Sequence, residues 1–220
     1  MPPPAPGRPT GRPTLTRERV LRAAIALADE EGVDAVTMRR LGQATGVEAM
    51  SLYNHVANKE DVLGGVLDLL VDEIPVARPR EDWRGAMREQ ALAARDLMER
   101  HPWAMRLLLA QRTMSASTLG YMDRVTGLML AGGLSPQLAH TSMHVLGSRV
   151  FGFSQELFDV NDMGPEVAAM LVGARSGRYP NVASTMSVIT HDDDAEFGIA
   201  LDLILDGLER RRIEGPQPPS

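Results

Sequence analysis

The residues with the clearest chemical use lie in two short apolar patterns separated by Gly46, a residue type that often ends a helix. In the second pattern Val47, Leu52 and Val56 recur on one side. The residues left on the other side are Ala49, Met50, Ser51, Tyr53, Asn54 and His55. These side chains carry almost no charge, and they suit the methyl groups, donors and acceptors that base edges offer in the DNA major groove. The pattern therefore predicts the reading helix of a helix-turn-helix.

The start of the following helix could bind the phosphates of the same DNA. Asn58 can cap the free N–H groups there, with Asp61 three residues on as in a capping box. A helix N-terminus carries a partial positive charge, and Lys59 adds a full charge beside it. We expect Lys59, Thr37 and His55 to hold the DNA backbone.

Two earlier helices must position this surface. Apolar residues at helical spacing predict a first helix from about Thr16 to Glu31. Thr37 is expected to cap a second helix, Met38–Thr45, because its hydroxyl can accept a free backbone N–H. This second helix is expected to bury Leu41 and Ala44.

A fourth helix is expected from Asn58 to Pro75, and it contains Gly64 and Gly65. Each glycine costs about 1 kcal/mol relative to alanine inside a helix. Two interpretations are open. The glycines allow close packing against the first helix, or they weaken a helix that passes motion from the C-terminal part to the reading helix.

The charge is distributed unevenly along the 220 residues, whose net charge is −6. Residues 1–60 hold eight Lys and Arg against seven Asp and Glu, or +1, whereas residues 61–220 hold 15 against 22, or −7. The basic charge is therefore local. An acidic remainder would restrict contact with DNA to one face.

Absences in the composition exclude several classes of protein. There are no cysteines, so disulfides, thiolate catalysis and cysteine-based zinc sites are excluded, and a reducing cytoplasm is the expected location. No signal peptide is evident, and no apolar run approaches the ~18 residues of a membrane helix. We expect a cytoplasmic protein that does not contact membranes.

The chain beyond Pro75 shows helical periodicity without the alternation typical of strands, which predicts an all-α fold. The expected helices lie at about residues 81–100, 102–112, 116–131, 136–159, 165–175 and 194–212. The helix at 136–159 has a heptad seam, and the helix at 194–212 has one apolar face. Two copies of this pair would form a four-helix dimer interface. The residues predicted to form it are Met143, Leu146, Val150, Phe153, Phe197, Leu201, Ile204, Leu205 and Leu208.

The C-terminal part offers no set of residues typical of an enzyme. His140 and His144 have the i, i+4 spacing of a zinc pair, but no third ligand follows at a fixed spacing, so a polar patch in a ligand cavity or interface is the preferred interpretation. Nucleophile, phosphate-loop and dinucleotide motifs are absent, and no metal or cofactor is expected. Residues that combine bulk with a few polar groups could line a cavity for an apolar small molecule. They are Trp103, Met122, His140, His144, Phe151 and Gln155.

The run VTMRRLGQATGVEAMSLYNHVANKEDVL resembles the DNA-binding domain of the tetracycline repressor (TetR) family. The likeness is strong over about residues 14–74, and it continues through YPNVA at 179–183 and FGIALDLILDGLERR at 197–211. It implies that Arg39 contacts a base edge or phosphate and that Lys59 contacts phosphate. The founding member holds tetracycline and magnesium through a histidine in its sixth helix. The matching segment here, Arg106–Leu109, has none, so that inducer is not expected.

The resemblance implies a homodimeric repressor that binds a palindromic double-stranded DNA operator and is released by a small-molecule effector. Arg39, Ala49, Met50, Ser51 and Tyr53 should then face base edges.

The expected domains are a basic Pro/Gly-rich tail at 1–13, a three-helix DNA-binding domain at 14–74, a helical ligand-binding and dimerisation domain at 75–212, and a disordered tail at 213–220. The first tail is either disordered or an arm that reaches DNA. Two other classes stay open. One is a ligand carrier with a vestigial DNA-binding head, and the other is a helical metalloenzyme built on the histidines.

Overall fold

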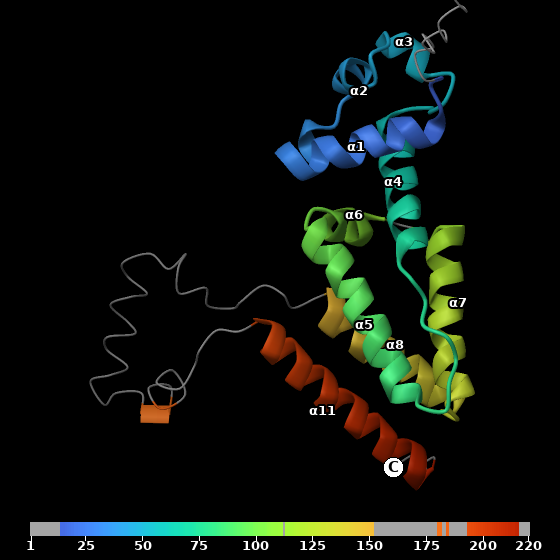
Figure 1. The fold of residues 1–220 in the computed structure, drawn as a ribbon, viewed down its shortest axis with the longest axis vertical. Coiled ribbons are helices and arrows are strands. Elements are labelled where there is room, and N and C mark those ends of the chain that lie inside the picture. Colours follow the sequence, from blue (N-terminus) through green and yellow to red (C-terminus); the bar gives the residue numbers. More distant parts are fainter. Residues whose placement is uncertain (1–13, 112, 152–179, 182–183, 185–192, 216–220) are drawn as a thin grey trace, which may run out of the picture. The chain divides into compact units, whose positions relative to one another are not determined.

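The computed structural model describes residues 14–111, 113–151, 180–181, 184 and 193–215. In this described part every regular element is helical and none is a strand, which confirms the predicted all-α class (Figure 1). The chain divides into two compact units. The first unit comprises Met1–Ile74 and Leu97–Tyr121, and the second comprises Pro75–Asp96 and Met122–Ser220. No described helix is both long and apolar enough to cross a bilayer.

Four helices and a short 3-10 turn form the N-terminal part of the first unit. They are α1 (Arg17–Glu31), η1 (Val33–Ala35), α2 (Met38–Thr45), α3 (Ala49–Leu52) and α4 (Lys59–Glu73). Helix α1 begins where predicted, because the Thr16 hydroxyl accepts from Arg19 N at 3.2 Å. Val20, Leu21 and Ala24 of α1 are buried, and α1 packs against α4.

The turn between α2 and α3 follows from two glycines. Gly46 has the left-handed conformation (φ 74°, ψ 29°) that ends α2 as predicted. Gly42 lies where a Cβ atom would meet the Val47 carbonyl oxygen at 2.9 Å, so the close approach of the two helices requires glycine. Thr37 caps α2 as expected, since its hydroxyl accepts from Arg40 N at 3.3 Å.

The predicted burial of Ala44 is wrong. Leu41 is buried, but its i+4 neighbour Thr45 shares the buried face and Ala44 is exposed. Burial of the Thr45 hydroxyl is possible because it donates to the Leu41 carbonyl at 2.7 Å. The buried face of α2 therefore includes Thr45, whose hydroxyl is satisfied by a hydrogen bond, and leaves the apolar Ala44 in solvent.

Helix α4 starts at the predicted cap, with Asn58 Oδ1 accepting from Asp61 N at 2.8 Å. The predicted capping box needs correction, because the Asp61 carboxylate accepts from Ala57 N at 2.8 Å and not from Asn58 N. The two glycines of α4 differ. A Cβ at Gly65 would meet Leu21 of α1 at 3.0 Å, whereas a Cβ at Gly64 would meet nothing within 4 Å. Close packing against α1 thus explains one glycine of the pair.

The remaining helices are α5 (Trp83–Arg100), α6 (Ala104–Ala110), α7 (Ala116–Ala131), α8 (Pro136–Phe151) and α11 (Asp193–Glu214). Their described ends lie within two residues of the expected ones, and α7 has the expected bounds at both ends. The expected helix at 165–175 and the last part of 136–159 lie outside the described residues. Because the division between the units falls after Asp96, α5 contributes to both of them.

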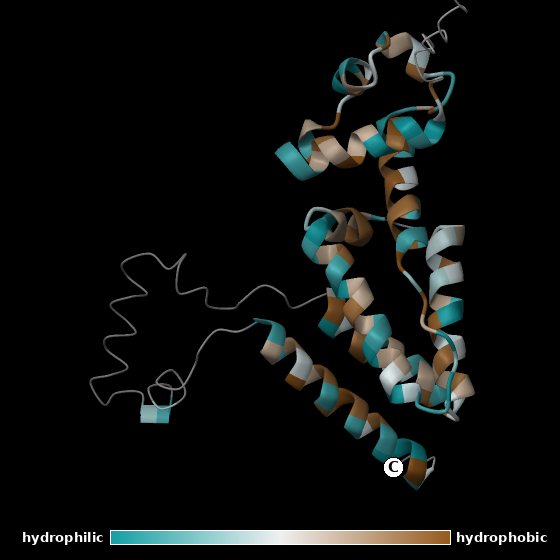
Figure 2. Cartoon of the chain, viewed as in Figure 1, coloured by the Kyte–Doolittle hydropathy of each residue, from teal (hydrophilic) through white to brown (hydrophobic). Residues whose placement is uncertain are grey.

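Helix α11 is fixed within the second unit by an apolar face and a row of charge pairs. Phe197, Leu201 and Leu205 are buried, and brown and teal residues alternate along α11 in Figure 2. Helix α5 pairs with it in antiparallel order. The contacts are Trp83 Nε1 to Glu209 at 2.9 Å, Arg84 to Asp206, Arg88 to Asp202, and Arg95 to Asp194 at 2.7 Å. Helix α8 also packs against α11.

Candidate nucleic-acid interface

The outer face predicted to read DNA is open to solvent. Met50 and Tyr53 are 74% and 49% exposed, and Ser51 is exposed, while Leu52 and Val56 are buried beneath them. Ala49 and His55 are half-buried. Helix α3 itself is only four residues long, and Tyr53 continues from it in a turn. The face therefore combines a short helix with the turn that follows.

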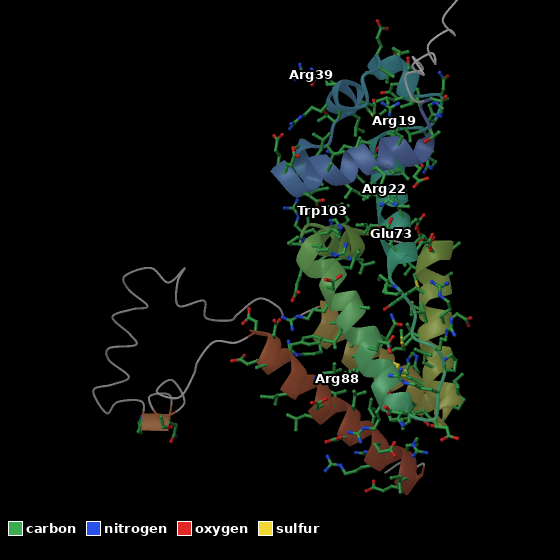
Figure 3. All side chains as sticks on the ribbon, viewed as in Figure 1. Arg19, Arg22, Arg39, Glu73, Arg88 and Trp103 are labelled. Atoms are coloured by element: carbon green, nitrogen blue, oxygen red, sulfur yellow. The ribbon has the colours of Figure 1, made fainter. Side chains whose placement is uncertain are left out.

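Adjacent arginines on α2 have different environments. Arg40 Nη1 donates to Glu31 Oε2 at 2.7 Å, and its Nη2 contacts the other carboxylate oxygen, so this guanidinium is engaged by α1. The hydrogen bond from Arg40 lowers the pKa of Glu31. Arg39 is exposed and has no hydrogen-bond or ion-pair partner among the described residues (Figure 3). Arg39 is therefore available to an external anion or base.

Lys59 is the first residue of α4, beside backbone N–H groups that have no carbonyl partner within the helix. Its side chain is half-buried, and no acidic partner is found for it within the described ranges. Thr37 is exposed at the start of α2, where its oxygen accepts the capping hydrogen bond. We use the term reading surface for Met50, Ser51 and Tyr53 together with Arg39 and Lys59.

Sequence reasoning missed a hydrogen-bond network that stabilises the segments next to the reading surface. Arg17 donates to both carboxylate oxygens of Asp61, at 2.7 and 2.8 Å, and to the carbonyl of His55 at 3.2 Å. The Arg17 hydrogen bonds, aided by Ala57 N–H, lower the pKa of Asp61 to about 2. This network ties α1 to the turn after α3 and to the start of α4.

The other described arginines near the N-terminus also support the fold. Arg19 Nη2 donates to the carbonyl of Thr45 at 2.9 Å, and Arg22 pairs with Glu73 (Figure 3). These two arginines and Arg17 are thus structural, because they bind groups of α2 and α4. The tail at residues 1–13 lies outside the described residues.

Four of the predicted ligand-lining side chains are described, one in the first unit and three in the second. Trp103 is buried in the first unit, where its Nε1 donates to Asp29 at 2.7 Å. Met122 is half-buried in the second unit. His140 and His144 are exposed neighbours with their Nε2 atoms 3.3 Å apart. The side chain of Phe151 and the whole of Gln155 lie outside the described residues.

Most residues predicted to form the dimer interface are buried within a single chain. Those with less than a tenth of their surface exposed are Leu146, Val150, Phe197, Leu201, Leu205 and Leu208. Met143 and Ile204 are half-buried, and Phe153 lies outside the described residues. Buried side chains have little area to offer a second copy. The large exposed apolar residues on the same two helices are Val145, Ile199, Leu203 and Ile213.

The family of the chain follows from comparison with known proteins. A family model described as the tetracyclin repressor-like C-terminal domain matches residues 74–212. A second model, of bacterial regulatory proteins of the tetR family, matches residues 20–66. The chain belongs to the TetR family.

Relatives of this TetR-family protein are regulators. It is 32% identical over 218 residues to the HTH-type transcriptional repressor DrrR1 of Streptomyces coeruleorubidus, covering 90% of this chain and 78% of DrrR1. It resembles apo ActR of Streptomyces coelicolor with a TM-score of 0.73 and 28% identity, covering 91% of this chain and 97% of ActR. The complex of ActR with actinorhodin gives a TM-score of 0.72 at 28% identity, covering 90% and 98%.

These findings identify the TetR-family protein as a ligand-responsive DNA-binding transcriptional regulator. Regulators of this family are generally not enzymes. Among the described residues no group of three or more His, Asp or Glu side chains could hold a metal ion.

Proposed function

We propose that the protein binds a palindromic DNA operator as a homodimer, represses transcription there, and is released by a small molecule bound in a C-terminal domain at residues 75–212. The observation that carries this proposal is the reading surface, which joins three exposed uncharged side chains to Arg39 and Lys59, two cations with no partner among the described residues. This surface suits a major groove with phosphates on either side.

The roles of individual residues follow from their chemistry. Arg39 and Ser51 can hydrogen-bond to base edges, and Ala49 and Met50 can offer apolar contact to thymine methyl groups. Tyr53 adds a ring and a hydroxyl at the same face. The residues proposed to hold the DNA backbone are Thr37, His55 and Lys59.

A dimer is needed because one short reading helix makes few contacts. Two copies held about 34 Å apart would meet successive major-groove faces of a palindrome. We propose that α8 and α11 form the dimer interface through Val145, Ile199 and Leu203, since these apolar side chains are exposed in one chain. The half-buried residues Met143 and Ile204 lie beside them along the same two helices.

The effector of this protein is proposed by analogy with ActR. One ActR structure contains actinorhodin, and another contains (S)-DNPA at 27% identity to this chain and a TM-score of 0.69. We therefore propose a small molecule of similar chemistry as the effector, and these two compounds are the first probes to try. Binding releases DNA only to the extent that the ligand prefers the form that does not bind the operator.

Selection of bound duplexes from random DNA tests the proposal most directly. A palindrome with two half-sites is expected. Lys59→Ala should weaken binding to all duplexes and reduce the salt slope by about one ion, whereas Ser51→Ala should change preference at one position of each half-site. Absence of any preferred duplex at low salt would contradict the proposal.

A ligand carrier with a vestigial DNA-binding head is the second candidate considered. A head without selection for DNA contact has no physical reason to keep Arg39 and Lys59 unpaired beside an exposed methionine and tyrosine. We therefore favour the regulator. The same selection experiment separates the two, because a carrier with a vestigial head would prefer no duplex.

A further inference from the structure

One carboxylate on α1 holds two buried rings that lie far from it in the sequence. Asp29 Oδ1 accepts from His101 Nδ1 at 2.7 Å and from Trp103 Nε1 at 2.7 Å. Both ring residues are less than a tenth exposed, and their rings meet edge to face at 5.8 Å. A carboxylate only accepts hydrogen bonds, so both ring nitrogens must carry a proton toward it.

The two rings flank the point where α5 ends and α6 begins. His101 directly follows α5, and its N–H donates to the carbonyl of Leu97 at 3.0 Å. Trp103 directly precedes α6. Asp29 therefore fixes the junction between α5 and α6 to helix α1.

Helix α5 begins in the second unit, where Arg84 and Arg88 pair with Asp206 and Asp202 of α11. It ends in the first unit, which also contains Asp29. An α-helix of 18 residues is a stiff connection about 27 Å long. The same helix thus carries the pairs with α11 near its start and ends at the junction that Asp29 holds.

A second contact, between α6 and the 3-10 turn that follows α1, provides a comparison. Arg106 of α6 pairs with Asp34 of η1 at 3.2 Å, but these side chains are 70% and 89% exposed. An exposed pair of this kind contributes little, because water screens it. The Asp29 carboxylate is a third exposed, but the two ring N–H groups that it accepts from are buried, so these charge-assisted hydrogen bonds hold the junction more firmly than the exposed pair does.

We propose that Asp29 is the positioning residue that couples α5 to the reading surface. The proposal rests on the proposed function, because it concerns how effector and operator binding are coupled. In the form described here Asp29 ties the α5–α6 junction to α1, and α1 is tied through Arg17 to the turn after α3. Without the carboxylate, a displacement of α5 no longer changes the position of the reading surface.

Hydrogen exchange of the full-length protein with its selected operator duplex tests this coupling. Coupling is reciprocal, so a duplex bound at the reading surface should slow exchange of amides in α5. We expect Asp29→Ala to abolish this slowing. Asp29→Asn retains an acceptor oxygen and should keep most of it. Asp34→Ala, which removes the exposed pair, should keep all of it.

The outcomes separate the two proposals. If the wild type binds the duplex and Asp29→Ala still slows exchange in α5 as the wild type does, the role of Asp29 is overturned and the proposed function stands. If the wild type binds no duplex, both are overturned. If Asp29→Ala does not fold by circular dichroism, Trp103→Phe replaces it, since the ring stays and one N–H donor is lost. Loss of the slowing in Trp103→Phe supports the role, and full slowing contradicts it.

Discussion

At the scale of single residues, the neighbours Arg39 and Arg40 show how local partners decide what a charge can do. Both lie on α2, but Glu31 of α1 engages only Arg40. The sequence contains no signal that separates the two, because the pairing depends on the angle between α1 and α2. The resemblance to a family singled out Arg39, and in the structure this side chain is exposed without a partner among the described residues.

We expect Arg39→Ala to weaken binding to the selected operator by about 1–3 kcal/mol, because a base or phosphate contact is lost. Arg40→Ala is the matched control. It removes the same charge from the next position and should weaken binding less than threefold. Fluorescence anisotropy with labelled duplex measures both. Equal losses in the two variants would mean that charge alone matters and that Arg39 has no specific contact.

Asp61 gives a prediction about pH. Its pKa is lowered to about 2 in the folded protein, against about 3.9 for an unfolded aspartate. The carboxylate therefore contributes stability above about pH 4, and this contribution is lost as pH falls toward 2. Asp61→Asn should reduce the free energy of unfolding at pH 6, and its deficit should shrink toward pH 3. Urea unfolding at the two pH values measures it.

Glu60→Gln serves as the control for Asp61, since Glu60 is an exposed neighbour in the same first turn of α4. Its effect on stability should be small at both pH values. A deficit of Asp61→Asn that did not change with pH would show that the network with Arg17 does not depend on ionisation.

At the scale of helices, the sequence predicted elements well where local signals specify them. Thr37 and Gly46 bound α2, and Ser135 caps α8 by accepting from Leu138 N at 3.2 Å. Burial was harder to predict. Thr45 is buried in place of Ala44 because its hydroxyl donates a hydrogen bond to the preceding turn. A search for apolar residues at helical spacing cannot detect such a bond.

The glycine pair of α4 yields a test at this scale. Gly64→Ala should stabilise the protein by about 1 kcal/mol, because alanine favours a helix and the added carbon meets nothing within 4 Å. Gly65→Ala should destabilise it, because the added carbon would lie 3.0 Å from Leu21 and 2.9 Å from Arg17. Thermal unfolding measures both. Similar effects of the two substitutions would contradict the packing explanation.

Whether Gly64 also acts as a hinge is a separate question. Gly64→Ala stiffens α4 without adding a clash, so it isolates flexibility from packing. If the hinge hypothesis holds, this variant should bind operator normally but lose ligand-driven release. Unchanged release would contradict the hinge hypothesis and leave packing as the explanation of Gly65 alone.

At the scale of the whole molecule, long-range contacts set the limit of what could be predicted. An apolar stripe looks the same in the sequence whether the same chain or a second copy covers it. The stripe of α11 that suggested a dimer interface is covered by its own chain, with Leu201 fully buried. Likewise, nothing in the sequence links Asp29 to His101, because they lie 72 positions apart.

Two leucines on α11 test the assignment. Leu203 is 68% exposed, so Leu203→Glu should leave the fold intact but favour the monomer and weaken operator binding. Leu201→Ala should instead cost about 2–5 kcal/mol of stability, because it opens a cavity in the core. Analytical ultracentrifugation and thermal unfolding distinguish the effects. A dimer unaffected by Leu203→Glu would place the interface elsewhere.

The two tryptophans fall one in each compact unit, Trp103 in the first and Trp83 in the second, and each indole donates to a carboxylate. The protein thus carries a built-in optical probe for each half. Replacing one indole at a time by phenylalanine leaves the other as the sole tryptophan, which can be excited selectively over the three tyrosines. Denaturation followed by its fluorescence would then reveal whether the two halves melt together or in sequence, without any attached dye.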